Sequence, residues 1–169
     1  MLKDIVSLST EKGFTDVVIL HEHKGEPDGL IVSHLPFGPT TYFGLSGVIL
    51  RHDLDKRPAT MSEQLPHLIF DNFESRLGRR LSDVLKHLFP VPKVDSSRVM
   101  SFSNSNDMIS FRHHVFNKEG HEQVALKEVG PRFEMKPYQI CLGTADKADA
   151  KKEWVLRPYM NTARKRKTF

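Results

Sequence analysis

Apolar residues at helical spacing predict two helices, of which the first is short. They recur between Leu2 and Leu8, and Gly13 follows where such a helix would end. We therefore expect a helix within residues 1–13.

The second helical pattern covers residues 73–89 and is the clearest in the chain. Six of its apolar positions fall within an arc of about 120° on a helical projection, which predicts one buried face. Asn72 is expected to cap this helix and Pro90 to end it. The six positions are Phe73, Leu77, Leu81, Val84, Leu85 and Leu88.

Most of the remaining chain has the pattern of short β-strands. Apolar residues flank a predicted turn at residues 26–29, which indicates a hairpin over residues 17–35. We expect the strands between residues 109 and 142 to form an antiparallel meander, and the loop over 53–66 to lie on the surface. Further strands are predicted at residues 42–50, 67–70, 99–103, 109–115, 124–129, 133–142 and 154–156.

Composition narrows the class of protein. The 169 residues are 38% hydrophobic, enough for one domain with its own core. No run approaches the 18 apolar residues of a membrane span, so no membrane partner is expected. The single cysteine, Cys141, excludes an internal disulfide framework and any Cys-x-x-Cys site. Because it lies in an apolar run, we expect a buried and inert thiol.

Charge is divided unevenly along the chain. Residues 1–75 carry a net charge of −5, and residues 76–169 carry +9. A basic half of this size favours a polyanionic partner, of which nucleic acid is the commonest. An uneven surface charge without such a partner is the alternative.

Two groups of cations carry this charge. One lies opposite the apolar face of the helix predicted over 73–89, where only Glu74 and Asp83 oppose it. The other is the end of the chain, with five cations and no acid between Arg157 and Phe169. Both patterns indicate phosphate binding, and for the helix a solvated face is the alternative. The helix cations are Arg76, Arg79, Arg80, Lys86 and His87.

Motifs for catalysis are few. The chain has no GxxxxGK[ST] or GxGxxG loop and no GxSxG nucleophile turn. Two histidines, His21 and His23, share one face of a predicted strand, and His34 is expected across the hairpin. This spacing leaves a second hypothesis, a metal-dependent nucleic-acid phosphoesterase that uses these three residues. Scattered surface histidines explain the same pattern without a metal and are favoured.

Several longer strings resemble the Brix-domain family of ribosome-assembly factors. One of them is the Gly-Pro-Arg-Phe element at residues 130–133. The ending Asn-Thr-Ala-Arg-Lys-Arg-Lys is similar to one branch of the family, which belongs to the U-three small nucleolar ribonucleoprotein of the small-subunit processome. The strings are residues 30–43, 66–73, 102–116, 129–135 and 161–167, in the family's order.

The resemblance implies an α/β (α+β) fold of two similar halves. Each half resembles an anticodon-binding domain, and the sheets are mixed or antiparallel. Residues 1–160 would form the Brix domain without its leading strand and helix, and residues 161–169 a basic tail. With the first half incomplete, we expect an unpaired sheet edge and an uncovered helix face.

The resemblance also implies a function. It is that of a non-catalytic, cofactor-free assembly factor of the nucleus and nucleolus, active in small-subunit ribosomal RNA processing. The implied partners are U-three small nucleolar RNA, pre-ribosomal RNA, M-phase phosphoprotein ten and a small RNA-binding processome protein. For Arg132, an ion pair with an acid is the alternative to RNA binding. The predicted RNA-binding residues are Arg76, Arg79, Arg80, Lys86, Arg112, Arg132, Arg164, Lys165, Arg166 and Lys167.

Overall fold

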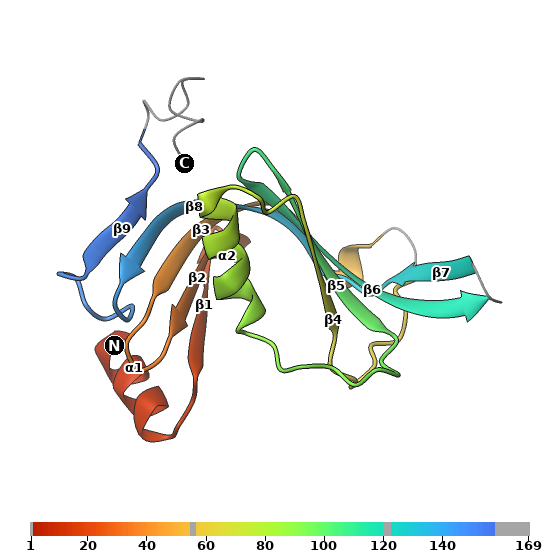
Figure 1. Cartoon of the computed structure of the whole chain (residues 1–169), viewed down its shortest axis with the longest axis horizontal. Coiled ribbons are helices and arrows are strands. Elements are labelled where there is room, and N and C mark those ends of the chain that lie inside the picture. The colour runs from red at the N-terminus through yellow and green to blue at the C-terminus, as the bar shows by residue number, and fades with distance from the viewer. Residues whose placement is uncertain (1, 55–56, 120–122, 158–169) are drawn as a thin grey trace. The chain divides into compact units, whose positions relative to one another are not determined.

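A computed structural model describes residues 2–54, 57–119 and 123–157. They divide into two compact units. Unit 1 comprises residues up to Leu45 together with those from Lys136 onward, and unit 2 comprises Ser46–Met135. Strands and a few helices make up both units, so the predicted α/β class is confirmed (Figure 1). No helix in the described ranges has the length and apolar character that crossing a membrane requires.

Unit 1 is built on an antiparallel hairpin, as the sequence predicts. Helix α1 (Leu2–Glu11) precedes strands β1 (Asp16–His23) and β2 (Glu26–His34), which pair with each other. Strand β3 (Thr40–Ile49) pairs with the other edge of β2, and β8 (Arg132–Leu142) pairs with β9 (Lys151–Val155). The long strands β3 and β8 contribute residues to both units.

The turn of this hairpin lies earlier than predicted. Residues 26–29 belong to β2, and the two-residue turn is Lys24-Gly25. Both turn residues have positive φ, 54° and 86°, which is the backbone that two-residue hairpin turns need. The turn predicted at residues 26–29 is therefore wrong, because the positive φ angles fall two residues earlier.

Strand β1 lies at one end of the strand order and pairs only with β2 among the described residues. Its Val18 and Leu20 are 54% and 58% exposed, and Ile5 and Leu8 of α1 are also exposed. An open sheet edge and a partly uncovered helix face were expected; the terminal place of β1 agrees with the first, and the exposure of Ile5 and Leu8 agrees with the second. The domain boundaries themselves remain a prediction.

Unit 2 contains a mixed sheet and the helix α2. Strand β4 (His67–Asp71) runs parallel to β5 (Arg98–Ser105), which is antiparallel to β6 (Met108–Glu119). The short β7 (Gln123–Glu128) also pairs with β6.

The expected meander is wrong, because β8 pairs with β6 and not with β7. His114 of β6 pairs with Glu128 of β7, and Phe111 of β6 pairs with Phe133 of β8. The two strands therefore follow one another along the same edge of β6. Residues 129–131 form a bulge between β7 and β8. This stretch has two more residues than the part of β6 that faces it. The Gly-Pro-Arg-Phe element spans the end of the bulge and the start of β8.

Helix α2 (Arg76–Lys86) is shorter than predicted at both ends. Its N-cap is Ser75, whose Oγ accepts a hydrogen bond from the Gly78 N–H at 2.8 Å. The predicted cap, Asn72, has a φ of 59° and donates its side-chain N–H to the Asn104 carbonyl instead. The predicted apolar face is confirmed over the helix itself, where Leu77, Leu81, Val84 and Leu85 are all buried.

A row of phenylalanines fixes the two faces of the unit 2 sheet. Phe70, Phe102, Phe111 and Phe133 come from β4, β5, β6 and β8, with successive ring centroids 4.9, 5.2 and 4.7 Å apart. Because neighbouring side chains of a strand point to opposite faces, Arg112 belongs to the other face.

Candidate nucleic-acid interface

The cations of α2 project from the side opposite its buried residues. Arg76, Arg79 and Lys86 are exposed, and Arg80 is half-buried. No ion pair within the described part of the chain neutralises Arg76, Arg79 or Lys86. These three side chains therefore leave their N–H donors to solvent or to a ligand.

Helix stability explains the place of Lys86, a cation in the last turn of α2, but not that of Arg76. Arg76 is the first residue of α2, and the first turn holds no acid. The positive end of a helix dipole lies there and favours anions, so an arginine at this position is mildly unfavourable for the helix alone. The same arrangement raises the local positive potential and suits a bound phosphate.

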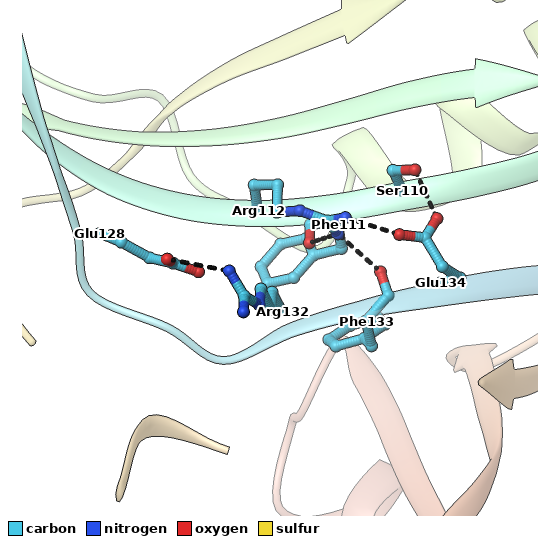
Figure 2. A network of polar contacts seen from close by, with 7 residues as sticks. All are labelled: Ser110, Phe111, Arg112, Glu128, Arg132, Phe133 and Glu134. Atoms are coloured by element: carbon cyan, nitrogen blue, oxygen red, sulfur yellow. Dashed lines mark hydrogen bonds and ion pairs between the residues drawn. The ribbon is translucent and has the colours of Figure 1, made fainter. Parts of the chain in front are cut away.

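Arg112, on β6, is engaged very differently (Figure 2). Its Nη2 donates to Glu134 Oε1 at 2.6 Å, and its Nη1 donates to the carbonyls of Phe111 at 2.7 Å and Phe133 at 3.3 Å. Ser110 donates to the second oxygen of Glu134. The guanidinium thus joins β6 to β8, and most of its donors are used within the protein.

The electrostatics of Glu134 agree with this structural role. Partial burial opposes its ionisation, but hydrogen bonds from Ser110 and Arg112 and the charge of Arg112 outweigh it. Together they hold the pKa of Glu134 below its usual value. The carboxylate is therefore a fixed partner for Arg112.

Arg132 has one carboxylate partner and borders a cavity. Its Nη1 lies 3.3 Å from Glu128 Oε2, so the ion pair considered as an alternative is present (Figure 2). Both residues line a cavity of about 420 Å³ in unit 2. The complete lining is Leu54, Arg57, Ala59, Leu126, Lys127, Glu128 and Arg132.

The sequence interpretation missed two cations of this cavity, Arg57 and Lys127. Arg57 falls in the loop over residues 53–66 and Lys127 alternates with apolar residues of a strand. Neither position carries a local signal for binding. Arg57 and Lys127 come close to Arg132 only in the folded chain, where β7 pairs with β6 and the loop over residues 53–66 contacts the end of β7. The four cations of the predicted tail, Arg164, Lys165, Arg166 and Lys167, lie outside the described residues.

The three histidines of the metal hypothesis are not brought together. His21 pairs with Gly29 near the turn of the hairpin, whereas His34 pairs with Asp16 at its far end. The side chains of His21 and His34 contact different acids, Asp28 and Asp16. Across the parts of the chain that the structure describes, no group of three or more His, Cys, Asp or Glu side chains could hold a metal ion. His34 does lie on the other strand of the hairpin, as expected, but at the opposite end from His21, so the three histidines do not form one site.

Comparisons with known proteins give a consistent result. Residues 1–139 match the Brix domain family. A Brix domain-containing protein of Caenorhabditis elegans is 57% identical over 166 residues, which are 98% of this chain and 56% of that protein. The U3 small nucleolar ribonucleoprotein protein IMP4 of Homo sapiens is 58% identical over 163 residues, 96% of this chain and 56% of its own length. The chain thus spans about half the length of these relatives.

A solved structure shares the fold. The probable ribosomal biogenesis protein of Aeropyrum pernix K1 superposes with a TM-score of 0.54 at 14% identity. The match covers 87% of this chain and 77% of that one. At this identity the likeness supports the fold alone.

Proposed function

The chain belongs to the Brix domain family, and from this membership we propose that it is a non-catalytic ribosome assembly factor that binds RNA. Its similarity to U3 small nucleolar ribonucleoprotein proteins supports a role in small-subunit ribosomal RNA processing. On the same basis we propose the nucleolus as its location. Its proposed partners are U-three small nucleolar RNA, pre-ribosomal RNA, M-phase phosphoprotein ten and a small RNA-binding processome protein.

The observation that carries RNA binding is the exposed cationic face of α2. Arg76, Arg79 and Lys86 are exposed and have no acidic partner within the described residues. Such cations bind phosphates with little sequence preference and release counterions when they do so. The helix is held by an apolar face of its own, so the cations contribute little to folding.

The test is the salt dependence of RNA affinity in a charge-reversed variant. Arg76→Glu with Arg79→Glu should lower the affinity for a structured pre-ribosomal RNA fragment and reduce the salt slope by about two. Fluorescence anisotropy of the labelled RNA at several salt concentrations measures both quantities.

The matched control is Lys3→Glu with Lys12→Glu, two exposed residues of the first helical stretch, in unit 1. This control variant changes the net charge by the same amount. Its salt slope should stay equal to that of the unaltered protein, because it keeps the phosphate contacts of Arg76 and Arg79. Equal losses in both variants would show that only net charge matters. Unchanged RNA binding with loss of a protein partner would assign the face to protein recognition.

A further inference from the structure

The cavity of unit 2 is held in shape by backbone contacts around it. The Ala59 N–H donates to the Glu128 carbonyl at 2.9 Å, and Arg51 Nη2 donates to the Ala59 carbonyl at 2.9 Å. These bonds tie the loop that carries Arg57 and Ala59 to the end of β7. Ala59 of the lining is therefore held on both its N–H and its carbonyl.

Gly130, of the Gly-Pro-Arg-Phe element, packs closely against Leu54 and Arg51. Its φ is 72°, and a Cβ on it would lie 3.1 Å from Cδ1 of Leu54 and 3.4 Å from Cα of Arg51. Only glycine combines this φ with so close an approach. The element thus packs against Leu54 through Gly130 and contributes Arg132, and both Leu54 and Arg132 line the cavity.

The lining combines cations with an apolar wall. Arg57, Lys127 and Arg132 supply three positive charges against one carboxylate, Glu128. The apolar lining residues are Leu54, Ala59 and Leu126. A ligand that matches both parts carries negative charge on one portion and a flat apolar surface on another. The volume of about 420 Å³ lies within the usual range for small-ligand sites.

Among the described residues, the one carboxylate that lines the cavity belongs to Glu128. Its Oε2 pairs with Arg132, while its Oε1 is buried with no hydrogen-bond partner in the described structure. Because Arg132 is engaged by this ion pair, Arg57 and Lys127 are the lining cations that supply most of the charge to an anionic ligand.

We propose that this cavity binds a single unpaired nucleotide of RNA, with its base against Leu54 and Leu126 and its phosphates near Arg57, Lys127 and Arg132. The inference rests on the proposed RNA-binding function and makes it more specific. A base inside an A-form duplex is stacked on both sides and cannot enter, so the cavity should select bulged or looped nucleotides.

The test compares two RNA hairpins that differ by one bulged nucleotide. The protein should bind the bulged hairpin at least about fivefold more tightly, which corresponds to about 1 kcal/mol of additional contacts. Leu126→Asn should abolish this preference and leave affinity for the paired hairpin unchanged. The matched control is Val124→Asn, because Val124 shares the same face of β7 and a similar exposure, 57% against 60%, but does not line the cavity.

A second readout places the base directly. With 2-aminopurine as the bulged base, fluorescence should change on binding to the unaltered protein and to Val124→Asn, but not to Leu126→Asn. Arg57→Gln should weaken binding of the bulged hairpin more than that of the paired one.

The outcomes separate this inference from the proposed function. Equal affinity of the unaltered protein for both hairpins would overturn the inference and leave RNA binding intact. No binding to either hairpin would overturn both. A bulge preference that survives in Leu126→Asn would also contradict the inference, because the bulged base would then bind elsewhere on the protein.

Discussion

The arginines of α2 and the arginine of β6 show how differently the same side chain is used in unit 2. Arg76 and Arg79 extend from a helix and have no acidic partner among the described residues. Arg112 donates to a carboxylate and two backbone carbonyls, which the pairing of β6 with β8 brings within reach. All three were predicted to contact RNA on the basis of charge and resemblance.

The difference indicates which cations can bind a phosphate without disturbing the protein. A phosphate that reached Arg112 would compete with Glu134, whose depressed pKa keeps it charged, and with two backbone carbonyls for the donors of the guanidinium. At Arg76 or Arg79 nothing needs to be displaced except water and counterions. We therefore propose that the helix arginines bind RNA and that Arg112 stabilises the sheet.

The largest effect on stability should come from a substitution in the buried face of α2, the helix that carries Arg76 and Arg79. Leu81 is fully buried in α2, so Leu81→Ala should cost about 2–5 kcal/mol of unfolding free energy through the cavity it leaves. Leu81→Met keeps the volume and should cost less than about 1.5 kcal/mol. Chemical denaturation measures both. If Leu81→Ala lowered the unfolding free energy by less than about 1 kcal/mol, the apolar face of α2 would not be tightly packed.

The next largest effect should come from Arg112 itself. Arg112→Gln removes the ion pair and the Nη2 hydrogen bond that Arg112 makes with Glu134, and should lower stability by about 1–2 kcal/mol. Solvent reaches both partners, which are 35% and 27% exposed, so the lower end is expected. Arg79→Gln should change stability by less than about 0.5 kcal/mol. Similar losses of stability in Arg112→Gln and Arg79→Gln would show that the β6 arginine is no more structural than the helix arginine.

A smaller effect should reveal a second structural side chain on β6, His113. The ring is buried, with Nδ1 2.9 Å from the Gly130 carbonyl and Nε2 accepting from Arg98 Nε at 2.9 Å. Burial lowers the pKa of His113, the Gly130 hydrogen bond opposes this, and the charge of Arg98 adds to it. The folded protein therefore holds this ring neutral at a pH where the unfolded chain takes up a proton.

The sign of the pH effect follows from this difference. The contribution of His113 is complete above the unfolded pKa of about 6.5 and is lost as the pH falls below it, by up to about 1 kcal/mol near pH 5.5. Denaturation at pH 7.5 and 5.5 should show a weaker pH dependence in His113→Gln than in the unaltered protein. His114→Gln, on the opposite face of the strand, should retain it. Equal pH dependence in both variants would show that His113 is not responsible.

Local patterns in the sequence predicted much of the fold. The apolar face of α2 and the alternation along β6 depend on neighbouring residues, so both could be found. The turn at Lys24-Gly25 could not, because residues 26–29 carry an equally strong turn signal and only the strand register decides between them. The continuation of β7 into β8 was missed for the same reason.

The candidate site was predictable only as a set of charges. The sequence shows that Arg79 and Arg112 are cations but not which of them meets an acid. The partner of Arg112, Glu134, is 22 residues away in the chain and becomes a neighbour through strand pairing. The cavity is harder still, since Arg57 and Arg132 come from distant segments that share no local motif.

The most direct test of this division compares the salt dependence of RNA affinity in two single variants. Arg79→Gln and Arg112→Gln remove the same charge from unit 2, and both are measured with one structured RNA across a range of salt concentrations. We predict that the salt slope falls by about one for Arg79→Gln and is unchanged for Arg112→Gln. A loss of slope in Arg112→Gln with none in Arg79→Gln would contradict the assignment of RNA binding to the helix.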